Sequence, residues 1–273
     1  MMFHAEQAGV LPDEQSGSRK DKSSNKLVLE KTLSFDIIRQ QKIAATHTGL
    51  DASQCYDRMV HAPTGLSMIQ HGGHEPAIRS MFEVLQNREH KVATAYGVST
   101  STYGGRKRIK KGQHPIQAIG QGNGAGPAAF VMLSSTMINV MRSKGFGALY
   151  AACLSLIRLT MVCSMFVDDS DIQNTAESTE ETGEDLMEKA QLSLDCWTGT
   201  LEATGGAINP DKSYWYLLDF TWQGTNWRYR TLDEMRAALY DKNPDGETSQ
   251  LRRLEADVAE KTLGESNWQP MAT

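Results

Sequence analysis

Long apolar runs are missing from this sequence, and cysteine and proline are scarce. No stretch of eighteen apolar residues occurs in the 273 residues, which excludes a membrane-spanning helix. The first twenty residues lack the central apolar block of a signal peptide. The four cysteines form no Cys-x-x-Cys pair, so we expect reduced core residues and neither a disulfide framework nor a zinc site. These absences predict an intracellular protein, cytoplasmic or nuclear, with no membrane contact and no evident protein partner.

Charge is divided unevenly between the two parts of the chain. The net charge is −5, but residues 1–111 carry 16 Lys and Arg against 11 Asp and Glu, while the remainder carries 12 against 22. Such asymmetry predicts one basic and one acidic surface, and local fields rather than the net charge steer a polyanion. The densest basic run is 106–111, and it fits a phosphate-facing surface and a solvated loop equally well.

Apolar periodicity predicts a mixed α+β fold. Helical spacing covers 23–41, 75–90, 127–144 and 250–263, and a shorter helix is expected from Pro63 to Gly72. A capping box at Ser178 and Glu181 is expected to open a further helix that contains 187–201. Segments 156–167 and 213–222 are typical of strands, and the turn at 223–226 predicts a hairpin. Strands separated by such helices indicate a sheet domain.

Two adjacent acids, Asp168 and Asp169, directly follow the apolar segment that ends in Phe166-Val167. Paired carboxylates at the end of a buried strand repel each other unless a cation neutralises them, and Mg²⁺ prefers oxygen ligands. A surface turn is the simpler interpretation of such a pair taken alone. Asp51 lies upstream, and two-metal enzymes that transfer nucleotides bring one acid from a neighbouring strand to such a pair.

Five segments in order resemble the motifs of reverse transcriptases, and specifically those of retrotransposons without long terminal repeats. Asp51-x4-Tyr56 resembles the first palm motif, Gln121-Gly122-x4-Pro127 the next, and Phe166-Val167-Asp168-Asp169 the aromatic-x-Asp-Asp box. The turn at 205–212, which ends in Lys212, resembles the following palm motif, and 11–20 is similar to a "PEQ-GFR" segment upstream of the palm. The resemblance covers residues 11 to about 230.

The resemblance implies an RNA-directed DNA polymerase that binds an RNA template, a DNA primer, deoxynucleoside triphosphates and two Mg²⁺ ions. It assigns metal binding to the carboxylates of Asp51, Asp168 and Asp169 and to the carbonyl of Ala52. Tyr56 would exclude a 2′-hydroxyl, Gln121 and Gly122 would line the nucleotide pocket, and Lys212 would assist the leaving pyrophosphate. A core tyrosine and a solvated turn lysine are the alternatives for Tyr56 and Lys212. Asp57 and Asp171 are assigned structural roles.

The expected architecture is a polymerase palm, an antiparallel sheet with helices packed on one face, plus partial fingers. We assign 1–50 and 72–115 to fingers, 51–71 and 116–230 to palm, and 231–273 to a connection toward a missing thumb. The Arg-Pro-Ile motif of the early fingers is absent, and Arg19 or 106–111 are the candidates to replace its triphosphate contacts. A truncated, catalytically inactive relic of a retroelement, or a nucleic-acid-binding module, is the alternative function.

Overall fold

The computed structural model describes residues 1–105, 116–120, 122–151, 157–243, 245–258, 260–262 and 265–268. The basic run 106–111 and Gln121 lie outside these residues, so the predictions made for them stay predictions. Among the described residues, no helix is long and apolar enough to cross a membrane.

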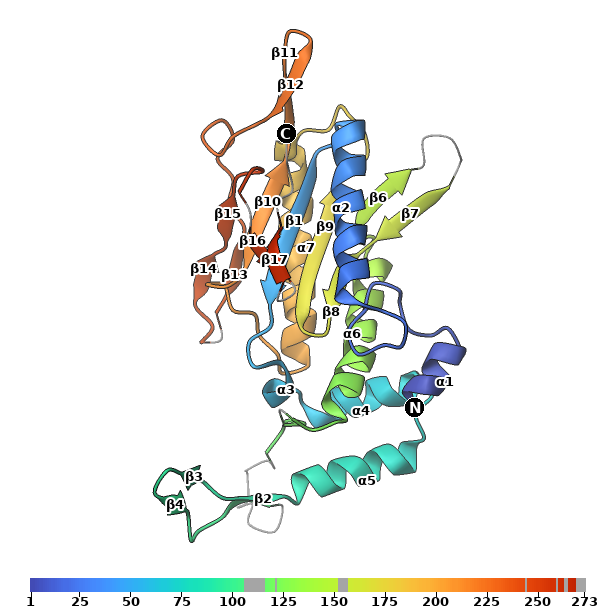
Figure 1. The fold of residues 1–273 in the computed structure, drawn as a ribbon, viewed down its shortest axis with the longest axis vertical. Helices are drawn as coiled ribbons and strands as arrows, with labels where there is room; N and C mark the ends of the chain where they lie inside the picture. Colours follow the sequence, from blue (N-terminus) through green and yellow to red (C-terminus); the bar gives the residue numbers. More distant parts are fainter. Residues whose placement is uncertain are drawn as a thin grey trace.

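A five-stranded sheet forms the centre of the molecule, in the order β15-β10-β1-β9-β8 (Figure 1). Its strands are β1 (Ala45–Asp51), β8 (Cys163–Phe166), β9 (Asp169–Thr175), β10 (Tyr214–Leu218) and β15 (Arg252–Leu254). The pairs β10–β1, β1–β9 and β9–β8 are antiparallel, as expected, whereas β15 adds to β10 in parallel. The predicted boundary between fingers and palm at residue 50 falls inside β1.

Two long helices cover one face of this sheet, because two crossover connections have the same hand. α6 (Gly126–Ser143) joins β1 to β8, and α7 (Gly183–Ala203) joins β9 to β10. Each crossover passes over one intervening strand, and right-handed crossovers of this kind place both helices on the same side. Leu50, Ile172 and Trp215 share a buried cluster with the two helices. The predicted packing of 127–144 and 187–201 on one face is confirmed.

The opposite face is partly covered by α2 (Ser24–Gln41), a position that the sequence pattern did not predict. Phe35 and Ile38 of α2 pack against Tyr214, Tyr216 and other residues of this face. The expectation that helices lie on one face only is therefore wrong. A helix near the start of the chain can reach this face because β1 follows α2 after a short connection. The end of the sheet that carries Asp51 lines a pocket, and none of the residues that line it belongs to α2.

The remaining elements surround this core. The helices are α1 (Met2–Gln7), α3 (Cys55–Arg58), α4 (His61–Gln70) and α5 (Glu75–Gln86). Short hairpins and strand pairs are formed by β2 (Glu89–His90), β3 (Ala93–Thr94), β4 (Gly97–Val98), β5 (Tyr103–Gly104), β6 (Ala148–Ala151), β7 (Arg158–Met161), β11 (Phe220–Gln223), β12 (Asn226–Tyr229), β13 (Tyr240–Lys242), β14 (Thr248–Gln250), β16 (Glu260–Thr262) and β17 (Glu265–Trp268). The predicted hairpin turn at 223–226 is confirmed by the pairing of β11 with β12.

Two local predictions are wrong. The described residues of 250–263 form strands instead of a helix: Arg252–Leu254 pairs with Tyr214–Tyr216. Its apolar spacing suits a helix, but the edge of β10 offers backbone partners that complete the sheet. The capping box of α7 uses Thr182 and Asp185 instead of Ser178 and Glu181. The apolar periodicity located α7 correctly, and the predicted capping box misplaced its first residue.

Candidate active site

The strands bring the predicted acids to one end of the sheet. Asp51 ends β1 and lies directly across from Asp169, the first residue of β9. Directly opposed residues share a face, with Cβ atoms about 5 Å apart. Phe166 pairs with Asp169, so Val167 and Asp168 form a two-residue turn between β8 and β9. The position of Asp51 and Asp169 on adjacent antiparallel strands agrees with the prediction. The convergence of all three carboxylates on one metal site stays a prediction.

A pocket of about 460 Å³ opens at this end of the sheet. Its lining is mostly polar and includes Asp51, Ala52, Tyr56, Asp168 and Lys212, which are five of the predicted site residues. The volume lies in the range of small-ligand sites. The Lys212 Nζ atom is 3.9 Å from Asp51 Oδ2, and two thirds of its side chain is exposed. Because the Lys212 side chain is largely exposed, its ammonium group can reach a bound anion without giving up buried contacts.

The turn that carries Lys212 is fastened to the end of β1 by backbone and hydroxyl hydrogen bonds. The Asn209 N–H donates to the Asp51 carbonyl at 2.9 Å, and the Asp51 N–H donates to Ser213 Oγ at 3.2 Å. Ser213 Oγ in turn donates to the Asn209 carbonyl at 2.8 Å. Asn209, which also lines the pocket, and Ser213 were not assigned a role from the sequence. Their position within the motif that ends at Lys212 was the available signal.

The electrostatics of the acids favour a cation. Burial raises the pKa of Asp168, and the negative charge of Asp51 adds to this effect. Burial and the charges of neighbouring aspartates raise the pKa of Asp169 to about 6, although Lys31 opposes the shift. Half-buried carboxylates that repel one another are stabilised by a divalent ion, which removes both the repulsion and the desolvation penalty.

The carboxylates in the pocket fit a Mg²⁺ site in which the protein supplies only one or two of the ligands. No group of three or more His, Cys, Asp or Glu side chains in the described part of the chain is arranged to hold a metal ion by itself. Mg²⁺ commonly uses one or two carboxylates, with water and substrate phosphates supplying the other oxygens. Asp51 and Asp168 on one pocket wall meet that requirement. The assignment of two ions, and of Asp169 and the Ala52 carbonyl as ligands, stays a prediction.

Tyr56 and Gly122 belong to segments that meet beside the pocket. Tyr56 lies in α3, and its ring packs edge-on against the ring of Phe130 in α6, with 6.3 Å between the ring centroids. The Tyr56 carbonyl accepts a hydrogen bond from the Ile119 N–H at 3.1 Å. Burial, with smaller contributions from Cys55 and Asp168, raises the pKa of Tyr56 to about 12, so the phenol stays neutral. Gly122 has φ of +87°, and a Cβ there would meet open space.

Arg19 is not available as a triphosphate ligand. Its guanidinium forms two hydrogen bonds of 2.7 Å with the Glu6 carboxylate, and only 5% of its side chain is exposed. It also donates to the carbonyl of Gln15 at 3.0 Å. The expectation that Arg19 could replace the early fingers is therefore wrong, because the residue is used to fix segment 11–20 against α1.

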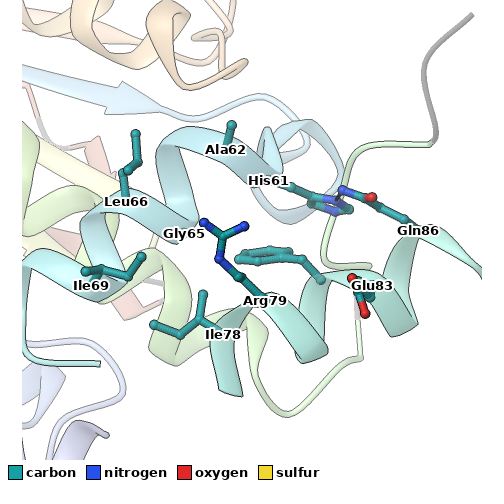
Figure 2. A pocket seen from close by; sticks show the side chains of 10 residues that line it. His61, Ala62, Gly65, Leu66, Ile69, Ile78, Arg79, Glu83 and Gln86 are labelled. Atoms are coloured by element: carbon teal, nitrogen blue, oxygen red, sulfur yellow. Dashed lines mark hydrogen bonds between the residues drawn. The ribbon is translucent and has the colours of Figure 1, made fainter. Parts of the chain in front are cut away.

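A second hollow lies between α4 and α5, away from the acids (Figure 2). Its wall is largely apolar, with Leu66, Ile69 and Ile78, and Figure 2 shows His61 beside Gln86 at one end. His61 Nε2 lies 2.8 Å from the Ala118 carbonyl, which ties α4 to the segment before α6. The histidine has a structural contact there, so the acid-lined pocket is the better candidate for chemistry.

Comparison with known proteins supports the fold. No family model matches the chain, and no curated protein matches it. Telomerase from Candida tropicalis, solved with a TWJ fragment of telomeric RNA, is similar in structure, with a TM-score of 0.52 and 13% identity, over 79% of this chain and 32% of that one. Telomerase from Candida albicans, also solved with a TWJ fragment of telomeric RNA, has a TM-score of 0.44 and 12% identity, over 82% of this chain and 34% of that one.

The chain therefore spans about a third of the length of these telomerases. The likeness to the Candida tropicalis telomerase, at 13% identity, concerns the fold alone. The central sheet, its two right-handed crossovers and the acids at one end of the sheet agree with this likeness in fold. The chain has a reverse-transcriptase-like, palm-type α+β fold.

Proposed function

We propose that this chain is a nucleic-acid polymerase domain that copies an RNA template into DNA with Mg²⁺, as part of a retrotransposon-type reverse transcriptase. The observation that carries the proposal is the shared pocket of Asp51, Asp168, Tyr56 and Lys212 within a reverse-transcriptase-like fold. The similar telomerase was solved with RNA, which supports an RNA partner for this chain. A DNA primer and deoxynucleoside triphosphates complete the proposed set of partners.

Each residue has a role that its position permits. Asp51 and Asp168 would hold Mg²⁺, which when bound lowers the barrier by stabilising the attacking and leaving oxygens of phosphoryl transfer. Lys212, whose side chain is largely exposed beside Asp51, would neutralise charge on the leaving pyrophosphate. Tyr56 is held by Phe130 and presents its neutral ring to the pocket, where it would exclude a 2′-hydroxyl by contact.

The direct test is addition of a single nucleotide to a DNA primer on an RNA template, with enzyme in excess over primer. We expect slow but template-directed addition, because positioning errors of about 1 Å reduce rates about a hundredfold and this chain spans only part of the similar polymerases. Asp168→Asn should reduce addition at least about a hundredfold. Asp211→Asn, an exposed acid in the turn before Lys212, is the matched control and should leave addition unchanged.

Metal binding gives an independent measurement. Titration with Mn²⁺, followed by electron paramagnetic resonance, should show binding that Asp168→Asn removes and Asp211→Asn retains. Binding of metal and template-primer without any addition would favour the inactive relic or nucleic-acid-binding module. Equal metal binding by wild type and Asp168→Asn would contradict the proposed site.

The sugar-selecting role of Tyr56 has its own test. Tyr56→Ala should raise incorporation of ribonucleotides relative to deoxyribonucleotides by at least about tenfold, which corresponds to about 1.4 kcal/mol of lost discrimination. Phe130→Leu, which loosens the support of the ring, should give a smaller change in the same direction. An unchanged ratio in Tyr56→Ala would assign Tyr56 to the core alone.

A further inference from the structure

Gln15, in the segment between α1 and α2, is fully buried. Its flanking residues form a short parallel bridge with β8: the Ser16 N–H donates to the Met165 carbonyl, and the Met165 N–H donates to the Glu14 carbonyl, both at 2.8 Å. This bridge places the Gln15 side chain over the turn between β8 and β9.

The Gln15 side-chain amide forms hydrogen bonds with both the N–H and the carbonyl of Val167. The Val167 N–H donates to Gln15 Oε1 at 3.2 Å, and Gln15 Nε2 donates to the Val167 carbonyl at 3.2 Å. Nε2 also donates to Ser134 Oγ of α6 at 3.0 Å, and Oε1 accepts from the Gly17 N–H at 2.9 Å. The amide has two donor hydrogens and a two-lone-pair acceptor, and these four bonds occupy all of them. Nε2 also lies 3.9 Å from Met165 Sδ.

Val167 needs such a support because its backbone is strained. Its φ is +60°, a left-handed conformation that β-branched residues rarely adopt. Strained residues persist only where their surroundings hold them, and they gather at functional sites. Val167 directly precedes Asp168, so the conformation of Val167 sets where the Asp168 carboxylate points.

Gly17 shows how closely this segment approaches the turn. A Cβ on Gly17 would lie 2.1 Å from the Val167 nitrogen and 2.8 Å from its Cα. Only glycine permits this approach, and the approach is what brings Gln15 within hydrogen-bond distance. Arg142 of α6 adds a further anchor, since its guanidinium pairs with the Glu14 carboxylate at 2.5 Å.

We propose that Gln15 is a positioning residue, which holds the left-handed Val167 peptide and thereby directs the Asp168 carboxylate into the pocket. The expected effect on catalysis rests on the proposed polymerase function, whereas the hydrogen bonds between Gln15 and Val167 are part of the fold itself. Residues that orient metal ligands typically change metal affinity or activity by about 10–100-fold when they are replaced.

The experiment compares Gln15→Met with wild type in the full 273-residue chain. Methionine keeps the volume and removes all four hydrogen bonds. Gln173→Met is the matched control, because Gln173 is a second buried glutamine whose partners, Tyr150 and His47, lie outside the pocket lining. Circular dichroism establishes that each variant is folded.

Two measurements distinguish positioning from general stability. Amide hydrogen exchange at Val167 should accelerate at least about tenfold in Gln15→Met and stay at the wild-type rate in Gln173→Met. Mn²⁺ affinity, measured by electron paramagnetic resonance, should fall about tenfold or more in Gln15→Met only. Where nucleotide addition is measurable, kcat should fall while KM for the nucleotide stays within about twofold.

Unchanged exchange and unchanged Mn²⁺ affinity in folded Gln15→Met would overturn the inference. If Gln15→Met does not fold, Ser134→Ala decides, since it removes the α6 anchor of the amide: about threefold faster exchange at Val167 supports the inference, and no change overturns it. Absence of Mn²⁺ binding in wild type would instead contradict the proposed function, and exchange at Val167 would still decide whether Gln15 holds the turn.

Discussion

Asp169 and Asp171 lie two residues apart on the same face of β9, and their surroundings affect them in opposite ways. Burial and like charges raise the pKa of Asp169 to about 6. Burial would also raise the pKa of Asp171, but Lys31 and His47 outweigh it and lower the pKa to about 2. Lys31 of α2 is completely buried and pairs with Asp171. Asp171 is thus neutralised by the protein, whereas Asp169 borders an acid-rich pocket.

This contrast separates a structural acid from a candidate functional one. Tyr150, Gln173 and His47 extend the Asp171 network under α2, with the Tyr150 hydroxyl donating to Gln173 Oε1 at 2.6 Å. A satisfied network of this kind fixes α2 on the sheet. Two residues away, at Asp169, an external cation would in the proposed site supply the charge that Lys31 supplies to Asp171. The prediction that Asp171 is structural agrees with these contacts.

The largest expected change in stability comes from breaking the buried ion pair between Lys31 and Asp171. Asp171→Asn leaves the Lys31 ammonium buried with a neutral partner, and loss of one member of such a pair typically destabilises a protein by about 3–5 kcal/mol. Urea denaturation monitored by circular dichroism measures the change in unfolding free energy. Lys26→Met, at an exposed position of the same helix, is the control and should change it by less than about 0.5 kcal/mol. A small effect of Asp171→Asn would mean that water reaches Lys31.

The next effect is the pH dependence of this pair. The folded-state pKa of Asp171 is about 2, below the usual aspartate value of 3.8, so its contribution to stability is present above pH 4 and is lost as the pH falls toward 2. The contribution amounts to about 2 kcal/mol. The double variant Lys31→Met/Asp171→Leu removes this titration. Its unfolding free energy should fall less steeply below pH 4 than that of wild type, and parallel curves would contradict the assignment.

A smaller effect of opposite sign is expected two residues away. Asp169→Asn removes a carboxylate that is desolvated and repelled by its neighbours, so it should stabilise the protein by up to about 1 kcal/mol at pH 7 in the presence of a chelator. The measurement is the same urea denaturation used for Asp171→Asn. If both substitutions destabilise the protein equally, the contrast between the two acids does not hold.

The smallest effect concerns Asp241 of β13, a half-buried carboxyl outside the sheet face. Burial raises its pKa to about 6, and Glu202 and Asp195 add to the shift. Because the folded-state pKa is raised, this group lowers stability as the pH rises from about 4 through 6. Asp241→Asn should therefore stabilise the protein at pH 8 by less than about 1 kcal/mol, since water screens the group, and should have no effect at pH 4. Differential scanning fluorimetry at the two pH values provides the comparison.

Local patterns in the sequence were sufficient for much of the fold. The helices α2, α6 and α7 follow from apolar spacing, and the β11–β12 hairpin follows from its turn residues. The order of the motifs around Asp51, Asp168 and Lys212 indicated a palm, and these residues do line one pocket. Such features depend on neighbours within one helix turn or one strand, which the sequence shows directly.

Other features depend on contacts between distant segments and were decided by the tertiary structure. The segment 252–254 became a strand because the edge of β10 was open to it, and Arg19 became a structural residue because Glu6 lies beside it. Gln15 meets Val167 across 152 positions, and Lys31 meets Asp171 across the interface between α2 and the sheet. No periodicity records these pairs. The sequence alone determined which acids the chain carries, and the packing of α2 decided which of them the protein neutralises itself.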